Sequence, residues 1–133
     1  MMTKEEHINH WLESAEEEMK MMKISFREGS FAYALFFWHL HLEKICKALW
    51  IKYNEGNHPP RIHNLVSILA KTPIELDRSQ ILFLSDLNRF QLESRYSDSN
   101  DNLFKECTKE YATEMMSEAE LIKKCLIQEL QKR

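Results

Sequence analysis

The positions of glycine and proline constrain the fold of this chain most strongly. Only two glycines and three prolines occur in 133 residues, and each lies where a helix would end or be interrupted. Gly29 follows one amphipathic segment, Gly56, Pro59 and Pro60 lie in one polar stretch, and Pro73 follows a short apolar segment. The long stretches between them carry no strong helix breaker, so we expect an all-α protein.

Apolar residues recur at three-and-four spacing between these breaks, which is typical of amphipathic helices. The capping-box patterns Thr3 with Glu6 and Asp77 with Gln80, and Ser30 as an N-cap, mark helix starts. The pattern predicts helices over Thr3–Arg27, Ser30–Tyr53, His63–Ala70, Asp77 to about Arg95, and from a start between Leu103 and Lys109 to Leu130, with Arg95–Asn102 as a turn-rich loop. We expect a single domain over residues 1–133, folded as an antiparallel up-and-down four-helix bundle with one additional short helix.

Composition excludes several classes of protein. The longest apolar run, Phe31–Trp38, is eight residues long and far too short to cross a bilayer. The first residues enter an amphipathic pattern with no apolar signal region, so we expect a cytoplasmic protein. Cys46, Cys107 and Cys125 are widely spaced and suggest neither a disulfide framework nor a zinc site. A formal charge of −3 leaves room only for a small anion site.

A polar stripe runs along the otherwise apolar second helix. His39, Glu43 and Lys47 recur every four residues. Around the helix axis each is therefore about 40° from the one before, so the three lie in one sector, which also holds Phe36 and Trp50. One interpretation is a simple Glu43–Lys47 pair with His39 stacked above it. The other is that this face meets a second subunit or a ligand, because unpaired buried charge is costly. His39 with Glu43 supplies only two metal ligands, so we expect no metal site.

A second group of candidate residues lies where the fourth helix is expected to end. Arg89 and Arg95 have guanidinium groups that suit phosphate, and Tyr96 can stack on a base or sugar. The alternative is structural: Arg89 pairs with Glu93 on the surface, and Arg95 interacts with the helix dipole. A third group, His63 and Asn64, stands at a helix start, where Asn64 is expected to act as a cap.

Three stretches of the sequence carry a family resemblance that covers nearly the whole chain. In this order they are SAEEEMKMMKISFREGSFAYALFFWHLHLEKICKALWIKY, HNLVSIL and RFQLESRYSD. Together they resemble the HEPN domain (higher eukaryote and prokaryote nucleotide-binding domain) of the small stand-alone prokaryotic kind. The resemblance implies a four-helix bundle that is usually dimeric and binds nucleotide or RNA in a cleft at the dimer interface.

The same resemblance implies an activity and a partner. Many HEPN proteins are metal-independent endoribonucleases or toxins, and small ones are often encoded beside a minimal nucleotidyltransferase as its partner. The ribonucleases carry an arginine followed after four to six residues by a histidine. From Arg89 those positions hold Ser94, Arg95 and Tyr96, and no other arginine in the chain has a histidine at that spacing. Because arginine does not deprotonate usefully, this sequence favours a non-catalytic role.

Three hypotheses follow. The leading one is a non-catalytic, dimeric module without a cofactor that binds nucleotide, RNA or a nucleotidyltransferase in a toxin–antitoxin-like pair. Its candidate binding residues are Arg89, Arg95 and Tyr96, with His39, Glu43, Lys47 and His63 on the adjacent face. The second is a metal-independent endoribonuclease in which His39 or His63 replaces the family histidine. The third is a structural homodimer.

Overall fold

Helices are the only regular elements in residues 1–91 and 98–133, which are the residues that the computed structural model describes. The helices are α1 (Lys4–Arg27), α2 (Phe31–Tyr53), α3 (Leu65–Leu69), α4 (Arg78–Asn88), α5 (Asp98–Glu106) and α6 (Lys109–Gln131). The all-α prediction is therefore confirmed.

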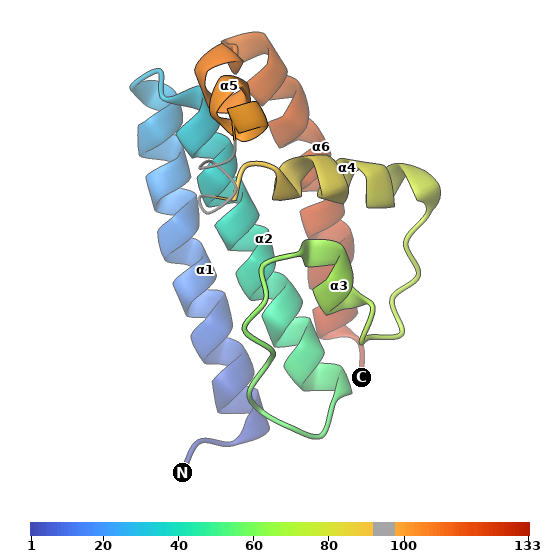
Figure 1. The fold of residues 1–133 in the computed structure, drawn as a ribbon. Coiled ribbons are helices and arrows are strands. Elements are labelled where there is room, and N and C mark those ends of the chain that lie inside the picture. The colour runs from blue at the N-terminus through green and yellow to red at the C-terminus, as the bar shows by residue number, and fades with distance from the viewer. Residues whose placement is uncertain (92–97) are drawn as a thin grey trace.

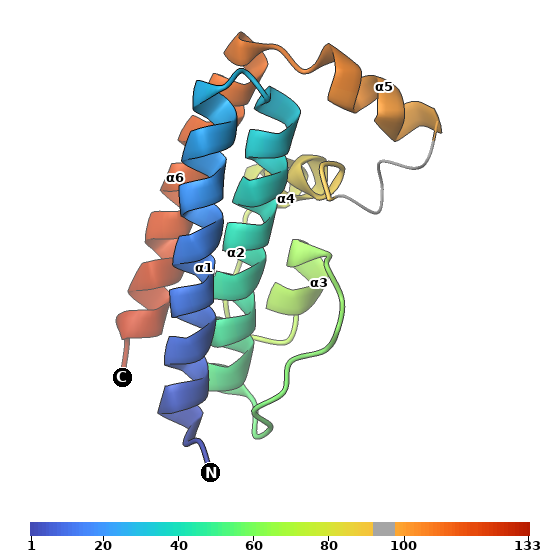
Figure 2. The same cartoon turned by 90° about the vertical axis from the view of Figure 1, so that its left-hand side faces the viewer.

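The chain passes four times along the length of the molecule. In Figure 1, α1 runs upward, α2 runs downward beside it, α3, α4 and α5 lead back up, and α6 runs down to the C-terminus. Figure 2 shows the three long helices side by side, with α3, α4 and α5 on one flank. Lys52 Nζ, near the end of α2, donates to the carbonyl oxygens of Leu130 (3.3 Å) and Lys132 (2.5 Å), so the same ends of α2 and α6 lie together. The up-and-down bundle is confirmed, but its third pass consists of three short helices.

Local signals at the helix starts hold in the structure, with one exception. The capping boxes at Thr3 and Asp77 are both formed. Gly29 ends α1 with φ of +82°, a conformation that costs little only for glycine. Ser30 is the N-cap of α2, but its side chain makes no capping hydrogen bond, and its carbonyl oxygen accepts from the amide of Ala34 at 2.9 Å.

The predicted end of α4 is wrong. We expected the helix to continue to about Arg95, but it ends at Asn88. The following amides bond three residues back, from Arg89 to Asp86 and from Phe90 to Leu87, which tightens the last turn. Phe90 lies in this turn and is fully buried in the core.

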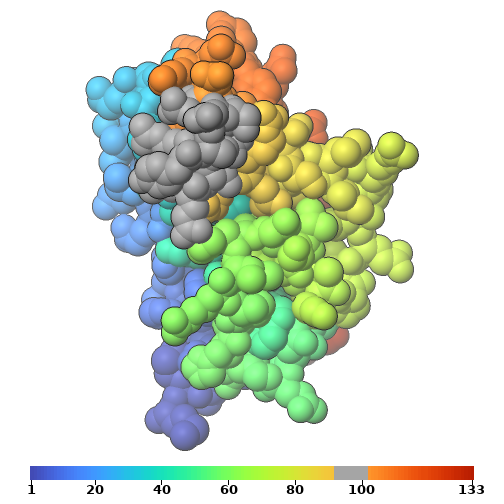
Figure 3. Space-filling view, in the orientation of Figure 1, coloured from blue at the N-terminus to red at the C-terminus, as the bar shows by residue number. Residues whose placement is uncertain are grey.

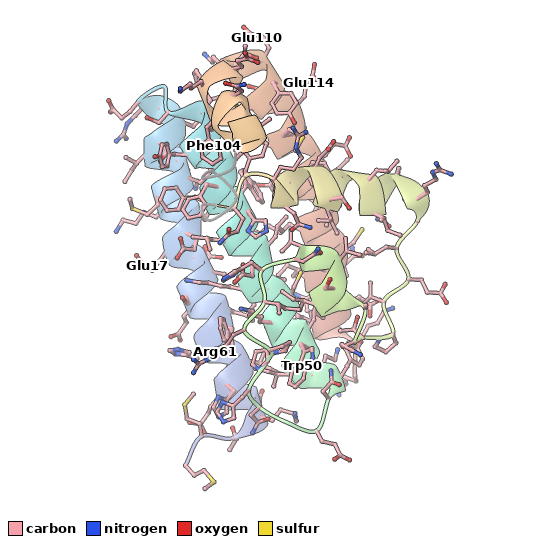
Figure 4. All side chains as sticks on the ribbon, viewed as in Figure 1. Glu17, Trp50, Arg61, Phe104, Glu110 and Glu114 are labelled. Carbon is pink, nitrogen blue, oxygen red and sulfur yellow. The ribbon has the colours of Figure 1, made fainter. Side chains whose placement is uncertain are left out.

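The helix α5 was missed, because residues 98–102 were assigned to a turn-rich loop. Its sequence, DSNDNLFKE, begins with residues that favour turns over helices. Leu103 and Phe104 pack against the core, and the Phe104 ring lies edge-on to the ring of Tyr33 at 5.9 Å. Figure 4 shows Phe104 at the upper end of the bundle, at the level of the first turns of α2. Tertiary packing therefore outweighs local propensity in this segment.

The core surrounds α2. One face of this helix, including Leu35, Leu42 and Leu49, is completely buried, as its apolar pattern predicts. Figure 3 shows that residues 54–70 and α4 cover much of α2 on the viewed side. The face of α2 that carries the polar stripe therefore lies beneath segments of the same chain.

Candidate functional site

The polar stripe of α2 is almost inaccessible to solvent. His39 has no exposed surface, and Glu43 and Lys47 are 5% and 6% exposed. Burying charged groups is costly unless they are paired and hydrogen-bonded. The surroundings of these three side chains therefore decide what this part of the molecule can do.

Glu43 is at the centre of the charged group. Its Oε2 accepts a hydrogen bond from Lys47 Nζ at 3.1 Å, and its Oε1 lies 3.0 Å from Nδ1 of His63. His63 comes from the segment that connects α2 to α3, and its side chain is 41% exposed. Lys47 Nζ also stands 5.5 Å from the centre of the Trp11 ring of α1, a cation–π contact. Glu43, Lys47, His63 and Trp11 form what we call the Glu43 cluster.

The cluster contains more than the simple i,i+4 pair of the first interpretation. Three segments contribute to it, namely α1, α2 and the α2–α3 connection. His63 is the member with substantial exposure, so a ligand approaching from solvent meets His63 and not the carboxylate behind it.

His39 faces a second partner, Asn88, at the end of α4. His39 Nε2 and Asn88 Oδ1 are 3.0 Å apart, and the backbone N–H of Leu65 donates to the same oxygen at 3.1 Å. Asn88 Nδ2 donates to Asn64 Oδ1 at 3.1 Å, and the N–H of Ser67 donates to that oxygen at 3.2 Å. We call His39, Asn88 and Asn64 the amide network.

The hydrogen bonds of the amide network fix the tautomer of His39. The Ser67 N–H requires an oxygen on Asn64, so Asn88 must present its NH₂ group to Asn64 and its oxygen to His39. His39 Nε2 therefore carries the proton and donates.

The other nitrogen of His39, Nδ1, is buried and has no hydrogen-bond partner among the described residues. Nδ1 lies 3.8 Å from Glu43 Oε1, which is too far for a hydrogen bond. This separation is expected when both atoms are hydrogen-bond acceptors. Burial lowers the pKa of His39, and the Asn88 contact and the Glu43 charge only partly oppose this. A neutral, enclosed imidazole of this kind serves the fold and is badly placed for proton transfer to a ligand.

Asn88 was not among the candidate residues, although it joins α4 to both α2 and α3. As expected, Asn64 caps α3, but its oxygen also connects the α3 start to α4. The available sequence signal was an asparagine inside a predicted helix, where this residue is less favourable than at caps and turns. Periodicity does not show that such a side chain bonds across the fold.

Arg89 points away from the amide network, although it follows Asn88 directly. Its side chain is about half exposed and lies 3.8 Å from Asp86. With Leu103, Glu106, Cys107 and Tyr111 it lines an open pocket between the end of α4, α5 and α6. Burial raises the pKa of the Cys107 thiol to about 11, so this cysteine remains protonated at neutral pH. The predicted Arg89–Glu93 pair, Arg95 and Tyr96 involve residues outside the described ones.

The predicted site residues therefore fall into separate places. His39, Glu43, Lys47 and His63 come together, with His39 and His63 each next to Glu43 Oε1. Arg89 lies on another surface, connected to them through the neighbouring Asn88. In the described part of the chain, no group of three histidine, cysteine, aspartate or glutamate side chains is arranged to hold a metal ion.

Comparison with known proteins identifies the family. The sequence model of the HEPN domain matches residues 8–130. The chain belongs to the HEPN domain family. Membership supports a nucleotide- or RNA-related module. Searches of curated proteins and of solved structures gave no match. In the residues that the structure describes, no helix of this HEPN domain has the length and apolar character needed to cross a bilayer.

Proposed function

We propose that this HEPN domain is a non-catalytic module that binds nucleotide or RNA, with Arg89 and His63 as its contacts among the described residues. The observation that carries the proposal is the division of the polar residues: three are enclosed, and Arg89 and His63 reach solvent. Arginine at an open pocket offers a forked donor for phosphate. Arg95 and Tyr96 remain predicted contacts in the same region of sequence.

Burial of His39 supports the non-catalytic part of the proposal. Metal-independent cleavage of RNA requires a group that exchanges a proton with the substrate near neutral pH. His39 is enclosed, its Nε2 proton is committed to Asn88, and its pKa is lowered by burial. The arginine–histidine spacing of the ribonuclease members is also absent from the sequence.

Binding is tested with a fluorescein-labelled single-stranded 12-nucleotide RNA and with ATP, in fluorescence anisotropy and calorimetry. Loss of one phosphate contact in Arg89→Gln should weaken RNA binding and make the dependence of log K on log salt shallower by about 0.7. Arg78→Gln is the matched control, because Arg78 is exposed at the opposite end of α4, roughly 16 Å away. Equal affinities of the wild type and both variants would exclude Arg89 as a contact, and absence of binding would refute the proposal.

A second candidate function is a metal-independent endoribonuclease with His63 in place of the family histidine. The contact of His63 Nδ1 with Glu43 Oε1 favours it, because a carboxylate orients a histidine and fixes its tautomer in many acid–base sites. Incubation of mixed RNA with the protein in EDTA, compared with His63→Ala, tests this. Cleavage lost in the variant would support the enzyme, whereas equal background would leave the binding module.

The proposal extends to assembly. We expect a homodimer that acts with a minimal nucleotidyltransferase in a toxin–antitoxin-like pair, as the sequence resemblance implies. Light scattering after gel filtration measures the molecular mass and so tests for the homodimer. Co-purification with the product of a neighbouring nucleotidyltransferase gene tests for the pairing. A monomer at micromolar concentration, or no co-purification, would contradict the respective expectation.

A further inference from the structure

The two candidate contacts, His63 and Arg89, are connected through side chains. His63 directly precedes Asn64, and Arg89 directly follows Asn88. The Asn88 amide donates to the Asn64 oxygen at 3.1 Å, which closes the connection. Two segments that are 24 residues apart in sequence therefore meet at one hydrogen bond, immediately beside the two residues proposed to contact a ligand.

Asn88 has little freedom to move in this network. Its oxygen lies within hydrogen-bond distance of His39 Nε2 and accepts from the Leu65 N–H, and its nitrogen is committed to Asn64. Displacement of the end of α4 would leave the fully buried His39 without a partner for Nε2, which is costly in a low-dielectric interior. Movement at Arg89 is therefore transmitted to the start of α3.

We propose that Asn88 is a positioning residue that couples the two proposed RNA contacts, which lie on separate surfaces, so that contact at Arg89 strengthens contact at His63. The inference rests on the proposed function. RNA held by Arg89 fixes the end of α4, and the Asn88–Asn64 bond then fixes His63. Because His63 is then already held in place, its contact with RNA costs less conformational entropy than it would without the Arg89 contact. The two contacts are therefore positively coupled.

The test is a double-mutant cycle in RNA affinity with Arg89→Gln and His63→Ala. The Kd of the labelled 12-nucleotide RNA is measured for the wild type, each single variant and the double variant. Distant, independent contacts contribute additively, whereas coupled ones do not. We expect the double variant to deviate from additivity by about threefold or more in Kd.

The cycle is repeated in two backgrounds that change the charge equally. Asn88→Asp removes the NH₂ donor and faces the Asn64 oxygen with a carboxylate, so the coupling should disappear. Asn64→Asp keeps an oxygen for both Asn88 and the Ser67 N–H, so the coupling should persist. Each substitution adds one negative charge, and its general repulsion of RNA cancels within each cycle.

The outcomes separate this inference from the proposed function. Affinity that depends on Arg89 but is additive with His63 in the wild type would overturn the coupling alone, as would coupling that survives Asn88→Asp. Absence of RNA binding would overturn both proposals.

A second measurement needs no substitution in the network: hydrogen exchange of the Leu65 amide should slow at least about threefold when RNA binds. An unchanged rate would also overturn the coupling.

Discussion

Replacement of Glu43 by leucine should destabilise the protein strongly, because it leaves Lys47 buried without its counter-charge. Breaking a buried ion pair on one side typically costs 3–5 kcal/mol. The side chains of Lys47 and Glu43 are only 7% and 6% exposed, but Lys47 keeps its contact with the Trp11 ring. We therefore expect the lower end, a loss of about 3 kcal/mol in the free energy of unfolding, or about 10 °C in Tm.

The assay is urea denaturation followed by circular dichroism, with linear extrapolation to water. Glu28→Leu is the control for an exposed pair, because Arg27 and Glu28 are 3.6 Å apart with side chains 71% and 68% exposed. It should change stability by less than about 0.5 kcal/mol. Glu43→Leu with Lys47→Met should recover most of the loss, because the unpaired charge is then removed.

Two results would refute this account of the Glu43 cluster. A loss below about 1 kcal/mol in Glu43→Leu would mean that the pair behaves as a solvated surface pair. A double variant as unstable as the single one would assign the loss to side-chain shape and not to unpaired charge.

Two further predictions concern acid stability and the first turn of the chain. Burial lowers the pKa of both His39 and His41 from 6.5, so on acidification the unfolded chain takes up protons that the folded chain does not. Through these two histidines, the free energy of unfolding should fall below about pH 6.5 by up to about 1.4 kcal/mol per pH unit for each histidine. Equal urea midpoints at pH 7.5 and pH 5.0 would contradict this. Gly29→Ala should lower the free energy of unfolding by about 1 kcal/mol because φ is +82°, whereas in Gly56→Ala the new Cβ meets the Trp50 ring at an ordinary 3.6 Å; calorimetry that shows equal melting temperatures for the two variants would exclude this explanation.

The long helices were predictable because local and tertiary preferences agree in them. The capping box at Thr3 and the glycine at position 29 bound α1 in sequence and in structure. In α4 and α5 the two preferences diverge: the chain leaves the helix after Asn88 although the apolar pattern continues to the buried Phe90, and Phe104 packs a helix from residues with weak propensity. Helical periodicity does not contain these long-range contacts.

The candidate site was predictable only in part, for a similar reason. Four-residue spacing placed His39, Glu43 and Lys47 on one line of α2, as the structure has them. What covers that line depends on the path of the chain after Tyr53, and periodicity within one helix does not specify this path. The contacts of Glu43 with His63 and of His39 with Asn88 join residues 20 and 49 positions apart, so only the folded structure reveals them.

Because the third pass consists of three short helices, the residues that build most of the core and the residues proposed to contact a ligand lie in different parts of the chain. Residues of α1, α2 and α6 supply most of the core, whereas the start of α3 and the end of α4 carry His63, Asn64, Asn88 and Arg89. Loops and short helices tolerate substitutions and changes of length better than a continuous core helix does. During evolution, the residues proposed to contact a ligand can therefore change between relatives, while the long helices keep the same scaffold.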